Sequence, residues 1–133
     1  MSAPEIDLRQ VLRLRDVLLH GCQVRRGAAT HLRPGAVEGD VEITAHNDDA
    51  EVVLYLVRVL TRLHSTDDAL IAQIDVTFAA LYDSAVDSTS LPDDLLAQFS
   101  QTARLDVHPY VRELLAGLTT RMGLPTVTLP VLA

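Results

Sequence analysis

Three side chains near the N-terminus have the chemistry to bind a metal ion: those of His20, Cys22 and His31. Imidazole and thiolate groups are common zinc ligands, but a structural zinc site usually takes about four of them, with paired ligands about two to four residues apart. The spacing of these three residues matches no such pattern. On a strand, His20 and Cys22 would share one face without a third and a fourth ligand. The sequence therefore predicts no metal ion and no other cofactor.

Acidic side chains are the next candidates for chemistry, because adjacent aspartates occur at positions 48–49, 67–68 and 93–94. All three pairs fall in expected turns or at an expected helix start, where aspartate hydrogen-bonds the backbone. The sequence also lacks a Gly-rich phosphate loop, a Gly-x-Ser-x-Gly motif and a His-Glu-x-x-His motif. These observations predict that the protein is not an enzyme. A small-ligand or enzymatic domain with a pocket under a helix, using His46 or Asp75, remains an alternative.

Length and charge limit the class of protein further. With 133 residues and a mass of 14.5 kDa, the chain predicts a single domain over residues 1–133. A net charge of -7 argues against a nucleic-acid or anionic-membrane partner, which would require a basic surface. The single Cys22, the lack of a signal-peptide pattern and the lack of a long apolar run predict a cytoplasmic protein that does not insert into membranes. The 48% hydrophobic content must then be buried inside, between subunits or against partner proteins.

Four segments have the residue pattern of strands. Residues 69–82 alternate most clearly between apolar and polar side chains. Residues 41–46 predict a short strand with one solvated face, and residues 51–63 predict a strand whose first half is apolar on both faces. Residues 14–25 are predicted as a strand, although a helical period also fits them.

The connections follow from turn chemistry. Residues 27–39 contain Pro34 and Gly35 and predict a loop, long enough to cross over the sheet. A turn is predicted at residues 47–49.

The C-terminal third predicts helices. Residues 109–122 form an amphipathic stripe, with Asp106 as its cap, Pro109 in its first turn, and Gly123 and Pro125 as stop signals. A separate short helix is predicted to begin at residues 93–94, where acidic side chains favour a helix N-terminus. Residues 124–132 are apolar but contain prolines, which predicts an extended segment laid on a surface.

Together these elements predict an α+β fold, a four-stranded antiparallel sheet followed by a helical layer that covers one face. Val52, Leu54 and Leu56 would lie on the other face, with nothing obvious in the chain to cover them. A second subunit or a bound protein is therefore expected there. The alternative is a strand that is buried on both faces inside an ordinary monomer.

Residues 107–129 read Val-His-Pro-Tyr-Val-Arg-Glu-Leu-Leu-Ala-Gly-Leu-Thr-Thr-Arg-Met-Gly-Leu-Pro-Thr-Val-Thr-Leu. This stretch resembles the SecB export-chaperone family, in which an aromatic-Pro-Tyr-x-Arg-Glu helix precedes a small residue, a proline and an apolar Leu-x-Leu segment. The residues in register are Pro109, Tyr110, Arg112, Glu113, Pro125 and Leu129. Residues 75–82, 15–17 and 51–54 resemble three of the family's strands in the same order, so the resemblance covers nearly the whole chain. The sequences of residues 78–83 and 109–113 are more similar to those of actinobacterial SecB-like chaperones associated with toxin–antitoxin systems than to those of export chaperones.

The resemblance implies a homotetramer, a dimer of dimers, that holds unfolded proteins in apolar grooves without ATP. One implied role is Sec-dependent export, with delivery of preproteins to the SecA motor. The alternative role is a dedicated chaperone for the antitoxin of a toxin–antitoxin–chaperone system. Asp16 and Asp75 match two acidic SecA-binding positions, whereas His20 stands where a third acid is expected. The chain ends at Ala133, before the second long helix and the acidic tail of the family.

A client-binding groove is expected to be lined by apolar residues from three strands and from the C-terminal segment. These residues are Val41, Ile43, Leu54, Leu56, Phe78, Tyr82, Val127 and Leu129. Such a groove would bind extended client segments by burial of apolar surface and by backbone pairing at a strand edge. The oligomer interface is expected along one side of the main helix, at Tyr110, Leu114, Gly117 and Leu118.

Overall fold

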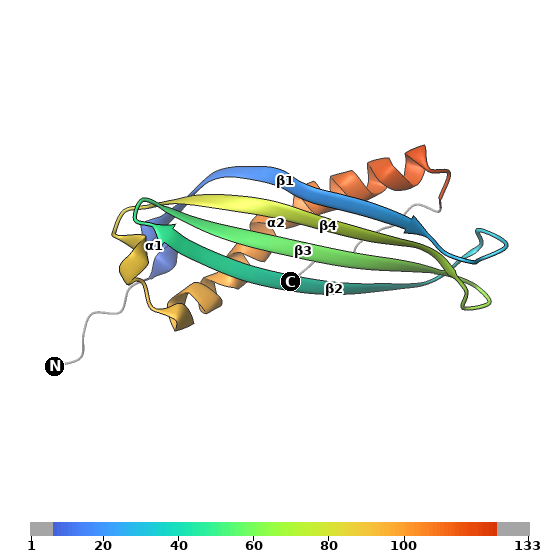
Figure 1. The fold of residues 1–133 in the computed structure, drawn as a ribbon, viewed down its shortest axis with the longest axis horizontal. Coiled ribbons are helices and arrows are strands. Elements are labelled where there is room, and N and C mark those ends of the chain that lie inside the picture. The colour runs from blue at the N-terminus through green and yellow to red at the C-terminus, as the bar shows by residue number, and fades with distance from the viewer. Residues whose placement is uncertain (1–6, 125–133) are drawn as a thin grey trace.

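A computed structural model describes residues 7–124 of the chain. It contains one sheet of four long strands and one long helix, joined by short connections (Figure 1). In chain order the elements are α1 (Leu8–Val11), β1 (Leu12–Arg26), β2 (Pro34–Asp49), β3 (Val52–Ser65), β4 (Leu70–Ser84), the 3₁₀ turn η1 (Ser88–Ser90) and α2 (Asp93–Arg121). The predicted α+β class, with an antiparallel sheet followed by a helical layer, is confirmed.

The order of the strands in the sheet is β1-β4-β3-β2, and every neighbouring pair is antiparallel. β1 and β2 follow each other in the chain but lie at opposite edges, so residues 27–33 cross the ends of β4 and β3 (Figure 1). Three inter-strand spacings amount to about 14 Å, well within the reach of this segment when extended. The predicted crossover is confirmed, and it makes both of these strands edge strands.

Two boundaries of β2 differ from the prediction. The loop is shorter than 27–39, because the strand already begins at Pro34, and the turn follows the strand at residues 50–51 rather than 47–49. Continuous pairing with β3 from Val37 to His46 outweighs the local preference of Gly39 and Asn47 for turns.

Glycine is required where the crossover meets the neighbouring backbone. A Cβ atom at Gly27 would overlap the carbonyl oxygen of Leu70, and one at Gly35 would overlap that of Ser65. The Gly27 N–H also donates a 2.9 Å hydrogen bond to the Ile71 carbonyl. The backbone therefore approaches closely at both ends of the crossover, which is possible only without side chains.

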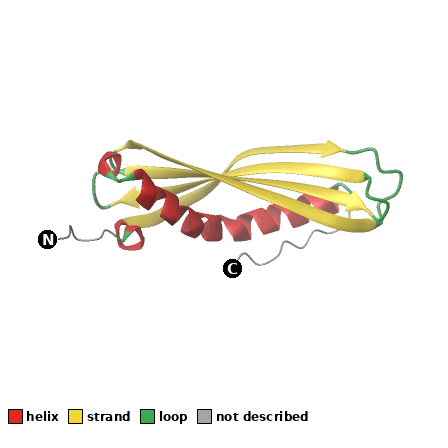
Figure 2. Cartoon of the chain, turned by 90° about the horizontal axis from the view of Figure 1, so that it is seen from below, coloured by secondary structure: helices red, strands yellow, loops and turns green. Residues whose placement is uncertain are grey.

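One face of the sheet is covered by α2. The helix starts beside β2 at one end and finishes beyond β1 at the other, so it crosses the twisted sheet diagonally (Figures 1 and 2). We call the covered face the helix face and the opposite one the outer face. At the far end, Arg26 of β1 donates a 2.7 Å hydrogen bond from its guanidinium to the Met122 carbonyl just beyond the helix. This contact ties the end of α2 to an edge strand.

Three aromatic rings form the centre of the core. Tyr55, Tyr82 and Phe99 lie with ring centroids 5.0–5.7 Å apart, in edge-to-face and tilted arrangements. The Tyr55 hydroxyl donates to the Leu96 carbonyl at 2.7 Å, and the Tyr82 hydroxyl donates to the Asp106 carboxylate at 2.6 Å. Burial raises the pKa of both phenols. Each buried hydroxyl thus anchors α2 to an inner strand of the sheet.

The C-terminal third forms a single helix, so the prediction of a short helix followed by a main helix capped by Asp106 was wrong. Asp106 instead lies inside α2 and accepts the hydrogen bond of Tyr82. Pro109 also lies inside the helix, where it removes one backbone donor. Buried Val107 and Val111 flank the proline, and their packing on the sheet keeps the helix continuous.

The predicted helix end is confirmed. Gly123 adopts a positive φ of 65°, and its N–H donates to the Thr120 carbonyl while the Leu124 N–H donates to the Thr119 carbonyl. These two bonds form a Schellman motif, which satisfies carbonyl groups that the last turn leaves free. None of the helices in residues 7–124 combines the length and the apolar character needed to cross a bilayer.

Candidate functional site

The residues predicted to line one groove lie on both faces of the sheet. Val41 and Ile43 of β2 are half-buried on the helix face, and Phe78 and Tyr82 of β4 are buried on the same face. Tyr82 is only 1% exposed, because it packs in the aromatic centre of the core. The four predicted groove residues on the helix face therefore differ in burial, and Tyr82 belongs to the core.

Leu54 and Leu56 point to the outer face, as predicted for the second apolar side of β3. Leu56 lies opposite Ala79 of β4, and Leu18 of β1 lies opposite Ala79 on its other side. These side chains form an apolar patch on the outer face, in which Leu18 is exposed and the β3 leucines are half-buried. The described residues thus do not bring the predicted set into one groove. Val127 and Leu129 lie outside the described residues.

A row of apolar side chains on β1 was not predicted as part of the site. Leu14, Val17 and Leu19 lie opposite Tyr82, Ala80 and Phe78 of β4, which places them on the helix face. We call these three residues the β1 row. Leu14 is 41% exposed and Leu19 is 52% exposed, because α2 does not cover this part of the edge strand.

The β1 row continues onto the helix. Tyr110 of α2 is 45% exposed, and its ring centroid lies 6.3 Å from that of Phe78, the cross-strand neighbour of Leu19. Leu19 and Tyr110 are therefore two exposed apolar side chains that both neighbour Phe78, which is itself buried. Large exposed apolar side chains that adjoin one another are typical of a surface that binds a protein. The sequence signal was present in residues 14–25, but the mixed period of that segment did not distinguish its two faces.

Two bulges interrupt β1 next to this row. The register with β4 shifts between Leu14 and Asp16 and again between Leu19 and Gly21, which leaves Arg15 and His20 as the extra residues. Arg15 forms an ion pair with Asp83 across the edge. The bulges explain why neither a helical nor a strand period fits the whole of β1.

Both residues predicted to bind SecA lie on the outer face, but in different environments. Asp16 is exposed, and its carboxylate accepts a 2.8 Å hydrogen bond from the Val17 N–H. Asp75 accepts two hydrogen bonds from Arg58, at 3.0 and 2.7 Å, and these bonds hold the pKa of its carboxyl below the usual range. Asp75 thus already has a strong cationic partner within the chain.

Arg58 belongs to a ladder of charges across the outer face. It contacts Asp75 of β4 on one side and, at 3.4 Å, Glu42 of β2 on the other. Arg62 donates to Asp40 of β2 alone, at 3.1 Å. The ladder links three neighbouring strands and gives the β2 side of the outer face a surplus of carboxylates.

The residues predicted for an oligomer interface lie along one side of α2. Tyr110 and Gly117 are exposed, whereas Leu114 and Leu118 are half-buried against the core. A Cβ atom at Gly117 would meet nothing within 4 Å. This side of the helix is thus accessible to another protein chain.

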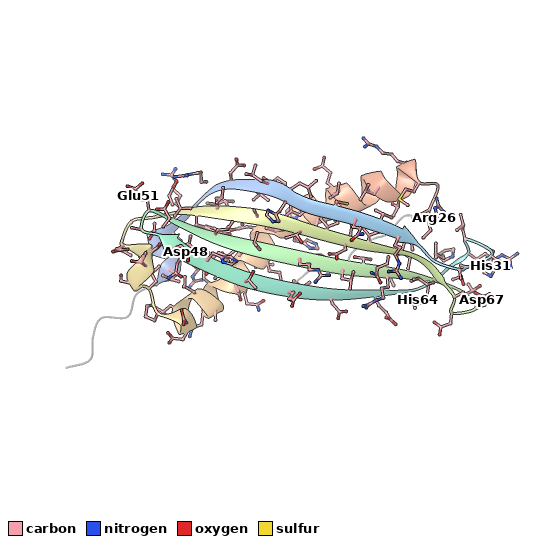
Figure 3. All side chains as sticks on the ribbon, viewed as in Figure 1. Arg26, His31, Asp48, Glu51, His64 and Asp67 are labelled. Carbon is pink, nitrogen blue, oxygen red and sulfur yellow. The ribbon has the colours of Figure 1, made fainter. Side chains whose placement is uncertain are left out.

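His46 and Asp75, the residues named for the alternative enzymatic site, do not lie together. His46 lies opposite Leu54, whereas Asp75 lies opposite Leu60, so the two residues are separated by six positions along β3, or about 20 Å. Asp48 and Glu51 lie at one end of the sheet, and His31, His64 and Asp67 lie at the other (Figure 3). Within residues 7–124, no three or more His, Cys, Asp or Glu side chains are arranged to hold a metal ion.

Comparisons with known proteins can now be set beside this geometry. No family model matches the chain. The chain is 27% identical to SecB-like chaperone Rv1957 of Mycobacterium tuberculosis strain H37Rv, in an alignment of 162 residues that covers 99% of this chain and 87% of the relative. The same values hold for SecB-like chaperone MT2006 of M. tuberculosis strain CDC 1551.

A solved structure agrees in fold. Rv1957 of M. tuberculosis, in complex with a ChAD peptide from the Rv1956 HigA1 antitoxin, superposes with a TM-score of 0.75 and 26% identity over 95% of this chain and 91% of that chain. The chain, with its sheet, its one long helix and its exposed apolar edge, is therefore similar to SecB-like chaperones. The mycobacterial chaperone Rv1957 resembles it in both sequence and fold. The predicted resemblance to SecB-like chaperones is confirmed.

Proposed function

We propose that this protein is an ATP-independent holdase that binds extended apolar segments of unfolded proteins, and that its main client is an antitoxin. The observation that carries the proposal is the group of exposed apolar side chains Leu14, Leu19 and Tyr110, of which Leu19 and Tyr110 both neighbour the buried Phe78. It occurs on the fold of a chaperone whose solved structure holds an antitoxin peptide. We place this activity in the cytoplasm.

The size of the apolar surface favours several contacts per client. Burying one large apolar side chain contributes about 2 kcal/mol, so useful affinity needs several side chains or several subunits. A homotetramer would supply repeated copies of the surface. We assign the contact between copies to Tyr110, Leu114, Gly117 and Leu118 of α2, because this side of the helix is accessible and largely apolar.

Client identity is tested by competition. The purified chain is mixed with a reduced, unfolded test protein and, separately, with the antitoxin of a toxin–antitoxin pair encoded beside its gene. The proposal predicts that aggregation of both is suppressed without nucleotide, and that the antitoxin displaces the test protein at a concentration at least ten times lower. Aggregation of both clients at the rate seen without the chain would contradict the holdase function. Equal competition would contradict only the dedication to an antitoxin.

Delivery of preproteins to SecA has less support. Asp75 is held by two hydrogen bonds to Arg58, so a basic partner would have to compete with an internal cation. Asp16 remains accessible on the outer face, and His20 stands where the third acid is expected. Titration of the chain with the basic C-terminal tail of SecA tests this role, and binding that is lost in Asp16→Asn would support it.

A further inference from the structure

One side of α2 carries a row of basic residues. Arg104, His108 and Arg112 follow one another at four-residue spacing, so each lies about 6 Å beyond the last along the helix axis. We call these three residues the α2 basic row. Tyr110, which neighbours Phe78 of β4, comes two positions after His108 and therefore lies on the other side of the helix. The α2 basic row is thus separate from the apolar side chains that adjoin β1.

The α2 basic row faces β2. Ser100 lies one turn before Arg104 on the same side of the helix, and with Ile43 and Ala45 of β2 it lines a cavity of about 270 Å³. Between residues 37 and 45, every side chain on the helix face of β2 is uncharged, because the acidic residues of this stretch alternate onto the outer face. Those acidic residues are Glu38, Asp40 and Glu42. The row therefore meets no carboxylate across the gap to β2.

The positive charge of the α2 basic row has no counter-charge in the described part of the chain. Arg104 and Arg112 form no ion pair within residues 7–124. Arg104 Nε and His108 Nε2 are buried there without a hydrogen-bond partner, which costs free energy. Outside this range Glu5 is the single acidic residue, so the remaining residues cannot supply a carboxylate to each member of the row.

His108 responds to this missing counter-charge. Burial lowers the pKa of His108, and the guanidinium groups of Arg112 and Arg104 lower it further. These two arginines are the charged groups that face the imidazole from α2, and the helix-face side chains of β2 and β3 near it are aliphatic. A carboxylate placed beside the row would oppose the effect of the arginines, because a nearby anion favours the protonated imidazole.

We propose that the α2 basic row is a binding site for an acidic segment of a partner protein, whose carboxylates pair with Arg104 and Arg112 on either side of His108. An arginine binds a carboxylate through two parallel N–H donors, and the Nε donor of Arg104 is one that has no partner within residues 7–124. Apolar residues of the segment would lie against the uncharged helix face of β2. This inference goes beyond the proposed holdase function, because it does not involve the β1 row.

A nucleic acid fits this site less well than a protein segment does. Its phosphates form a continuous line of negative charge, whereas the row is short and belongs to a chain of net charge -7. It would also leave the aliphatic face of β2 without an apolar partner. An acidic protein segment carries separate carboxylates among apolar side chains, which matches basic side chains that stand beside an aliphatic strand.

Binding is measured by fluorescence anisotropy with a labelled peptide that contains glutamate and valine, and with a control peptide in which glutamine replaces every glutamate. The double variant Arg104→Gln and Arg112→Gln should bind the acidic peptide at least tenfold more weakly. The matched control, Arg25→Gln and Arg121→Gln, removes two exposed arginines that form no ion pair within residues 7–124, and should change binding less than twofold. Equal losses in the two variants, or equal binding of the glutamine peptide, would overturn the proposal.

The unaltered chain provides a second readout that does not depend on how the variants fold. The imidazole signal of His108 is followed by NMR against pH, with and without saturating acidic peptide. The peptide should raise the pKa of His108, and it should therefore bind more tightly as the pH falls from about 7.5 to about 5.5. The signal of His20, which is exposed on β1, should not respond to the peptide. A pKa of His108 that the peptide leaves unchanged would contradict the site.

Further measurements separate this proposal from its rivals and from the holdase function. A change of solution mass in the Arg104→Gln and Arg112→Gln variant would assign the row to a contact between copies. Displacement of the acidic peptide by a lower concentration of a single-stranded oligonucleotide of equal charge would assign it to phosphates. Either result would overturn the proposal. If the chain suppresses the aggregation of an unfolded protein but does not bind the acidic peptide, only the present inference falls, and the holdase function stands.

Discussion

The two edges of the sheet present the same backbone groups with opposite side-chain chemistry. β1 is bulged at Arg15 and His20 and displays the large apolar side chains of Leu14 and Leu19. β2 is regular from Val37 to His46, and its charged residues are all acidic. A bulged edge resists regular strand pairing, whereas a regular edge invites it. The comparison teaches that the two edges of one sheet can carry different surfaces, an apolar one at β1 and an acidic one at β2.

The topology makes this separation possible. Because residues 27–33 cross the sheet, the inner strands are β3 and β4, which carry the aromatic core and hold α2. The two edge strands contribute fewer buried residues and so tolerate specialised surfaces. Both surfaces nevertheless share one rigid support, so changes at the core should affect them equally and changes at one edge should not.

The largest predicted effect is a charge placed in the β1 row. Leu19→Glu should weaken the capture of an unfolded client about thirty-fold, because about 2 kcal/mol of apolar burial is lost. Leu105→Glu is the matched control, since Leu105 is equally exposed on α2 but lies outside the β1 row. Equal losses in the two variants, measured by suppression of client aggregation, would contradict the assignment of the β1 row.

Glycine changes at the crossover should be next in size. Gly35→Ala should lower the free energy of unfolding by about 1–3 kcal/mol, because the new methyl group overlaps the Ser65 carbonyl and displaces the start of β2. Gly21→Ala, at an exposed position of β1 where a Cβ atom would meet nothing within 4 Å, should raise it by about 0.5–1 kcal/mol. Urea unfolding followed by circular dichroism gives both values. A neutral Gly35→Ala would show that the crossover does not constrain the β2 edge.

A core hydrogen bond should affect both edges alike. Tyr82→Phe removes the 2.6 Å bond to Asp106 and leaves that carboxylate without this donor, at an expected loss of about 1–2 kcal/mol in unfolding free energy. Tyr110→Phe is a control for the unfolding free energy alone, because the exposed Tyr110 hydroxyl has no hydrogen bond with the described residues. An unfolding free energy that is unchanged in Tyr82→Phe would contradict the role of this bond in holding α2 on the sheet.

The smallest predicted effect concerns acid stability. Arg58 depresses the pKa of Asp75 in the folded state, so the pair contributes stability above the unfolded pKa of aspartate, about 3.9, and loses it as pH falls through the folded pKa. As the pH falls below about 4, the native protein should therefore lose more stability than Arg58→Gln. Parallel pH profiles from thermal unfolding would refute the role of Arg58 as the partner of Asp75.

Much of the fold was predictable because its signals are local. The alternation in β3 and β4 and the glycine stop at Gly123 each fix an element within a few residues. The continuity of α2 through Pro109 was not predictable, because it depends on packing against a sheet made of distant segments. The length of β2 was missed for the same reason, since pairing with β3 carries the strand across its glycines.

The site was predicted less completely than the fold. A list of apolar strand residues does not say which ones α2 will bury, so Tyr82 was placed in a groove although it is in the core. Leu14 and Leu19 were missed because the bulges of β1 shift the faces of the strand in mid-sequence. The alternating acidic residues of β2 begin at Glu38, inside residues 27–39, which were expected to form a loop. Diagonal helix placement and register shifts are tertiary features that the residue pattern does not encode locally.

The most direct test of the account is the solution mass of the protein, measured by light scattering with and without a reduced, unfolded client and with no nucleotide present. The account predicts a mass of about four protomers that rises by one bound client, and it predicts that Leu19→Glu abolishes the rise without changing the oligomer. A monomer whose mass is unaffected by the client would contradict it. In that case the exposed β1 row would have no role in holding unfolded proteins.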